Sequence, residues 1–80
     1  MSERELRELA ARIQALEFVV ENMLVERMRD EAGEADPAQA ATARLSAIRR
    51  GQEATMPHDV LRAVEHLWRR VIAKLSGRSA

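Results

Sequence analysis

Cysteine is absent from the 80-residue chain, which excludes disulfide bonds, thiolate metal ligands and cysteine nucleophiles. Tyrosine is also absent, and tryptophan and phenylalanine occur once each. Only 22 large apolar side chains follow Met1, which is a small supply for a stable core. Because short chains bury a modest share of their surface, we expect oligomerisation to supply further burial.

Long hydrophobic runs are absent as well. No stretch of about 18 apolar residues marks a membrane span. Residues 2–5 (Ser-Glu-Arg-Glu) are charged, unlike the start of a secretion signal, so we expect a cytoplasmic protein without membrane contact. Arginine supplies twelve of the thirteen basic residues, a bias typical of a GC-rich bacterial genome. Period-two alternation is missing, and no strand is predicted.

Helical periodicity is what the chain does contain. Its first segment places apolar residues at spacings of 3, 4, 3, 4 and 3, the pattern of a coiled-coil seam about three heptads long. This seam consists of Leu6, Leu9, Ile13, Leu16, Val20 and Met23. Further apolar residues surround the later part of the segment, namely Phe18, Val19, Leu24, Val25 and Met28. A helix that is apolar on most sides must be buried on more than one side, so we expect a second copy or another helical protein against it. The seam and Leu24 are the predicted self-association residues.

Residues 3–31 are predicted to form this first helix. Ser2 can accept a hydrogen bond from the N–H of Glu5, and the Glu5 carboxylate can reach back to the N–H of Ser2, which is the pattern of a capping box. Gly33 is the predicted helix terminator.

Two shorter helices are predicted to follow. Residues 37–50 form the second helix, with Asp36 as its N-cap and Gly51 as its end. Residues 56–76 form the third helix, for which Thr55 is the best N-cap candidate.

The third helix carries its own regular stripe at spacings of 3, 4, 3 and 4, which is predicted to pack the hairpin onto the first helix. The stripe consists of Leu61, Val64, Trp68, Val71 and Leu75. Residues 77–80 are expected to form a disordered tail. The predicted fold is a single all-α domain over residues 1–80: a long amphipathic helix followed by a helical hairpin, three helices per chain, dimerising into a helical bundle.

Charge is divided between the two halves of the chain. Residues 1–40 carry five arginines against ten acids, a balance of −5, and residues 41–80 carry eight cations against three acids, a balance of +5. These charges favour a hairpin that folds onto the first helix of the same chain or of a partner. Alternatively, the cations form a patch for an acidic protein or nucleic acid. The candidate partner-binding cations are Arg49, Arg50, Arg62, Arg69, Arg70 and Lys74.

Few residues are candidates for catalysis or metal binding. His58 and His66 lie two helical turns apart with Arg62 between them, a spacing unsuited to a metal site. Glu17 and Glu21 are four residues apart, but the Glu-x-x-His motifs of carboxylate-bridged bundles are missing. We interpret the two glutamates as part of a solvated helix face. No catalytic residue, metal or cofactor is expected.

Residues 13–17 (Ile-Gln-Ala-Leu-Glu) and 24–27 (Leu-Val-Glu-Arg) resemble the first helix of the all-helical chorismate mutases, and the order of helices is similar. This resemblance places Arg27 where that family keeps an active-site arginine. Ala10, however, stands where the earlier catalytic arginine is expected, and no lysine precedes Lys74. Because such an enzyme stabilises its transition state with fixed cations, we interpret the resemblance as one of helical pattern and keep a mutase-like enzyme as a remote alternative.

The sequence therefore predicts a small non-catalytic interaction module. It self-associates through the first helix and acts as a regulator, adaptor or inhibitor of a larger protein. The alternative is a nucleic-acid-binding regulator that uses the arginine-rich faces of the second and third helices. The connector between those helices is longer than the 3–4-residue turn of a helix-turn-helix motif.

Overall fold

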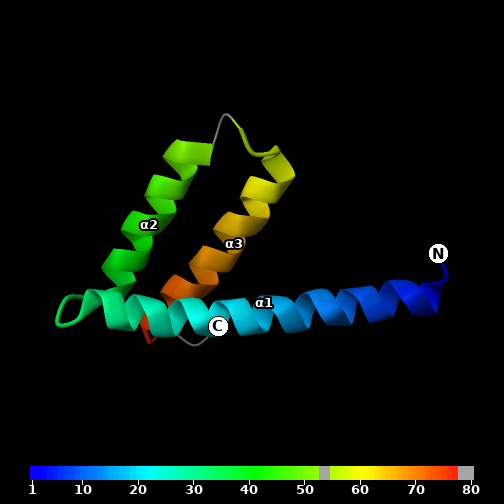
Figure 1. Ribbon diagram of the computed structural model, residues 1–80, viewed down its shortest axis with the longest axis horizontal. Helices are drawn as coiled ribbons and strands as arrows, with labels where there is room; N and C mark the ends of the chain where they lie inside the picture. The colour runs from blue at the N-terminus through cyan, green and yellow to red at the C-terminus, as the bar shows by residue number, and fades with distance from the viewer. Residues whose placement is uncertain (53–54, 78–80) are drawn as a thin grey trace.

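The computed structural model describes residues 1–52 and 55–77. Helix α1 spans Glu3–Ala32, α2 spans Pro37–Gln52 and α3 spans His58–Leu75. The described residues contain no strand, so the prediction of an all-α chain with three helices is confirmed. Figure 1 shows α2 and α3 as a hairpin standing on the C-terminal part of α1, whereas the N-terminal part of α1 extends beyond the hairpin.

Local signals fix both ends of α1. The Ser2 hydroxyl oxygen accepts a hydrogen bond from the N–H of Glu5 at 3.2 Å, as predicted. The Glu5 carboxylate accepts from the Ser2 hydroxyl at 3.2 Å, where a full capping box would use the Ser2 N–H. After Ala32, Gly33 adopts a φ of 58°, which glycine tolerates because it has no Cβ. The predicted terminator is confirmed.

Helix α2 begins as predicted and ends later. Asp36 Oδ1 accepts a hydrogen bond from the N–H of Ala38 at 2.9 Å, which confirms Asp36 as the N-cap. The prediction that Gly51 ends the helix is wrong, because α2 continues through it to Gln52. Gly51 lacks the positive φ of a terminating glycine, and a glycine inside a helix costs only about 1 kcal/mol.

The predicted start of α3 is also wrong. Thr55 does not cap the helix, which begins at His58 after Pro57. Proline disfavours the helical conformation of the residue before it, so Met56 cannot belong to the first turn. The Thr55 hydroxyl instead donates a hydrogen bond to Gln52 Oε1 at 3.0 Å.

The end of α3 is close to the predicted one. Leu75 is the last helical residue, the Ser76 hydroxyl donates to the carbonyl oxygen of Ile72 at 2.8 Å, and Gly77 adopts a φ of 73°. The rest of the predicted tail, residues 78–80, lies outside the described residues.

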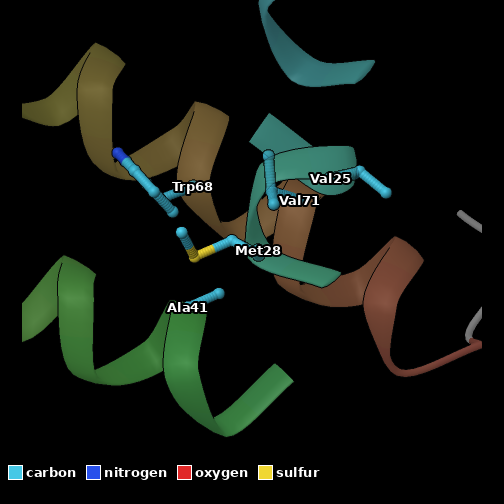
Figure 2. Close-up of a cluster of buried hydrophobic side chains, with 5 residues drawn as sticks. All are labelled: Val25, Met28, Ala41, Trp68 and Val71. Atoms are coloured by element: carbon cyan, nitrogen blue, oxygen red, sulfur yellow. The ribbon is translucent and has the colours of Figure 1, made fainter. Parts of the chain in front are cut away.

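The hydrophobic core lies where the three helices meet. Its buried members are Val25 and Met28 from α1, Ala41 from α2, and Trp68 and Val71 from α3. Figure 2 shows the Met28 side chain reaching between Trp68 and Ala41. The partly buried residues packed around them are Leu24, Leu45, Ile48, Val64, Ile72 and Leu75. Val25 and Met28, which the sequence had suggested for contact with another chain, are thus covered by the hairpin of the same protomer.

The core assignment predicts different costs for one substitution at two sites of α3. Val71 has no exposed area, whereas Val60 is 45% exposed. Val71→Ala should lower the free energy of unfolding by about 2–3 kcal/mol, because it removes two buried methyl groups and leaves a cavity. Val60→Ala should change it by less than about 0.5 kcal/mol. Urea denaturation followed by the fluorescence of Trp68 measures both, and equal losses would contradict this core.

Candidate functional site

The seam of α1 is exposed. All of residues 1–20 are exposed, and within the seam the exposed fraction runs from 39% for Leu9 to 65% for Leu16. Figure 1 shows the reason, since the hairpin covers only the C-terminal part of the helix. A continuous apolar stripe that no other element of its chain covers marks a candidate interaction site.

The seam and the hairpin use different faces of α1. At 3.6 residues per turn, the seam lies about a third of a turn away from the face formed by Glu21, Val25 and Met28, which meets the hairpin. A second helix can therefore contact the seam while the hairpin keeps its place. Leu24 lies between the two faces and packs partly against the core, so it is less available to another chain than the six seam residues.

Two further apolar side chains of α1 are exposed outside the seam, Val19 beside it and Phe18 on the opposite side of the helix. Phe18 and Val19 are both more than half exposed. The Nζ atom of Lys74 lies 5.7 Å from the centre of the Phe18 ring, within range of a cation–π interaction. Phe18 is therefore linked to α3, and Val19 extends the apolar surface beside the seam.

A buried carboxylate lies at the point where α3 crosses α1. Glu21 is 1% exposed, so the interpretation of Glu21 as part of a solvated face is wrong. Arg70 Nε lies 2.7 Å from its Oε1 and Lys74 Nζ lies 2.5 Å from its Oε2. Arg70 also lies 3.8 Å from Glu17, which remains half exposed. Glu21, Arg70 and Lys74 together form what we call the Glu21 clamp.

The geometry of the Glu21 clamp is that of an ion pair rather than of a full hydrogen-bond network. Oε1 of Glu21 accepts no hydrogen bond from the described residues, although Arg70 Nε is close, because the Arg70 N–H is not aligned with this oxygen. Both oxygens face cations, which leaves no open side for a substrate. The sequence held a signal for this contact, since two carboxylates four residues apart on α1 meet two cations four residues apart on α3.

Other cations from the predicted partner-binding set also contact carboxylates of the same chain. Arg49 of α2 and Arg69 of α3 lie 3.2 and 3.7 Å from Glu65 of α3, so Arg49 joins the two arms of the hairpin. Arg44 of α2 lies 2.8 Å from Glu31 of α1. Of these pairs, only Arg44–Glu31 connects the hairpin to α1, whereas the pairs of Glu65 lie within the hairpin.

The predicted cation patch is thus divided. Four of its six members, Arg49, Arg69, Arg70 and Lys74, have carboxylate partners. Arg50 and Arg62 form no ion pair with a described residue. Arg62 lines an open depression between α1 and α3, together with Glu17, Asp59, Ala63 and His66.

The remaining sequence-based candidates concern metal binding and the position of Arg27. No group of three or more His, Asp or Glu side chains there is placed to hold a metal ion. Arg27, the position raised by the resemblance to chorismate mutases, is largely exposed and lies 3.0 Å from Glu31. None of the three described helices has the length and apolar character needed to cross a membrane.

Comparison with known protein families, curated proteins and solved structures gives no significant match to this chain. Its function must therefore be inferred from its own residues.

The Glu21 clamp predicts an asymmetry between its anion and its cations. Arg70→Met combined with Lys74→Met leaves a buried carboxylate without compensation and should lower the free energy of unfolding by about 3 kcal/mol or more. Glu21→Gln leaves two half-exposed cations that water can solvate, so its cost should stay near 1–2 kcal/mol.

Urea denaturation measures these changes. Arg50→Met combined with Arg62→Met is the matched control, because it also removes two cations and should cost less than about 0.5 kcal/mol. A larger loss for Glu21→Gln than for the double clamp variant would show that the clamp does not compensate a buried charge.

Proposed function

We propose that the chain is a non-catalytic interaction module that self-associates through the seam of α1. As a dimer it acts as a regulator, adaptor or inhibitor of a larger protein in the cytoplasm. The observation that carries the proposal is the exposure of all six seam residues, which lie on a face of α1 that the hairpin does not cover.

The apolar area of the seam is large enough for reversible association. Two copies contribute twelve seam side chains that are each about half exposed. Burying them gains roughly 9–18 kcal/mol at about 1.5–3 kcal/mol per fully buried side chain. Association of two chains costs about 4–15 kcal/mol in lost freedom. These values support a reversible dimer whose population rises with protein concentration.

A second copy of the chain is the occupant that the seam fits best. Knobs spaced by 3 and 4 residues interdigitate with an identical set on a neighbouring helix. The formal net charge of the chain is zero, so two copies approach without net repulsion. The hairpin occupies another face of α1 and leaves the seam open to the second helix.

Self-association predicts that charges placed in the seam separate the two chains. Ile13→Asp combined with Val20→Asp should reduce the mass in solution to the 9.0 kDa of one chain. Both residues are exposed in the protomer, so the three helices should remain folded. Sedimentation velocity over a range of concentrations measures the mass, and circular dichroism measures the helix content.

The control variant carries Ala11→Asp and Gln14→Asp, which add the same charge to the same helix outside the seam. It should sediment like the unsubstituted protein. The proposal fails if the unsubstituted chain is a monomer at all concentrations. It also fails if the seam variant keeps the mass of a dimer. If the unsubstituted chain gains mass only when another helical protein is added, that protein and not a second copy occupies the seam.

The surface left for a larger partner is the outside of the hairpin with its cations. Nucleic acid is the alternative ligand for this surface, but four of the six candidate cations already contact carboxylates. We therefore expect no binding of a fluorescent DNA duplex by anisotropy at low salt. Binding that weakens steeply with added salt would instead support the nucleic-acid alternative.

A further inference from the structure

We infer that two copies pair their seams in parallel and in register, so that both hairpins lie at the same end of a two-stranded stem. This inference rests on the proposed self-association and adds the orientation of the second copy. The charges beside the seam favour this orientation, and the side-chain types within the seam fit a parallel pair of two strands.

The order of side chains in the seam fits a parallel pair of helices with two strands. In heptad notation, the a positions are Leu6, Ile13 and Val20, and the d positions are Leu9, Leu16 and Met23. Within parallel coiled coils, β-branched residues at a with leucine at d favour two strands over three or four. The second and third a positions are β-branched, and the first two d positions are leucine.

The residues beside the seam complement one another in the parallel arrangement. A residue at g faces the e residue five positions later in the other chain, which brings Arg12 next to Glu17 of the second copy. Both side chains are exposed in the protomer, and Glu17, which lies 3.8 Å from Arg70 of its own chain, keeps a half-exposed side chain. The same rule brings Val19 next to Leu24 of the second copy, which extends the apolar contact.

The antiparallel arrangement gives fewer favourable contacts beside the seam than the parallel one. Its symmetric register sets Leu6 opposite Met23 and Leu9 opposite Val20 of the second copy. Glu5 then faces Glu26, and Arg12 faces Val19, because g residues meet g residues. The parallel pair also sets one like-charge contact, Glu26 opposite Glu31 of the second copy, so the contact of Arg12 with Glu17, which only the parallel pair forms, is the one that favours it.

The parallel orientation also determines which surface of the dimer a larger protein would contact. The hairpins pack on residues 21–28, near the C-terminal end of each stem helix, and stay clear of the seam. Both copies therefore present the same hairpin surface at one end. A partner with two matching sites could engage both hairpins at once and gain avidity without any new contact.

Cysteine cross-linking tests the orientation, because the natural chain has no thiol. In the parallel pair, Leu9 faces Leu9 of the second copy, and a disulfide needs Cα atoms within about 7 Å. In the antiparallel pair, the same two residues are 11 positions apart along the axis, or about 16 Å at 1.5 Å per residue. Leu9→Cys should therefore form a disulfide under mild oxidation and double the mass from 9.0 kDa on a non-reducing gel.

A mixture of Leu9→Cys and Val20→Cys chains provides the opposite test. A disulfide between the two different chains, identified by intact mass, would show the antiparallel pair and overturn the inference while leaving self-association in place. Ala11→Cys, placed outside the seam, is the control and should remain unlinked. A dimeric protein in which Leu9→Cys does not cross-link also overturns the inference. A protein that stays monomeric overturns the proposed function with it.

Discussion

Each arm of the hairpin is much shorter than the helix on which it packs, and the exposure of the N-terminal part of α1 follows from this difference in length. α1 has 30 residues, whereas α2 and α3 have 16 and 18 and cross α1 steeply instead of lying along it. All buried residues of α1 lie between Glu21 and Met28. The C-terminal part of α1 therefore contributes to the core, whereas its N-terminal part does not. An exposed apolar stripe on α1 is the direct result.

Charge explains why the hairpin packs on its own zone of α1 and leaves the seam free. Apolar contact has no preferred direction, so burial of apolar area alone does not select the core face over the seam. Glu21 distinguishes the two faces, because its burial requires the cations of α3 at one place. The exposed pair of Arg44 and Glu31 adds a weaker contact between α2 and α1. The clamp thus contributes more to the choice of packing site than to net stability, since desolvation offsets much of a buried ion pair.

Signals that act within a few residues could be predicted from the sequence, and contacts between helices could not. Asp36 was identified as a cap because a cap bonds to its own first turn. Thr55 was misassigned because the effect of Pro57 on the preceding residue outweighs a side-chain cap. The seam could be predicted from its spacing alone. That Val25 lies in the core and that Glu21 is buried could not, because periodicity defines a face of a helix without specifying what covers it.

The proposed self-association would couple folding to association through α1. Most helical stability in proteins comes from tertiary packing, and residues 3–16 have none within their own chain. The Ser2 cap and the Arg4–Glu8 pair at 3.7 Å support this segment only locally, and pairs of this kind contribute about 0.3–0.5 kcal/mol. Under the proposed association, the hairpin holds Val20 and Met23 in helical form, and the second chain extends that order toward Leu6. The hydrophobic core would then keep the C-terminal end of the seam helical, and the helix of the second copy would stabilise the N-terminal end.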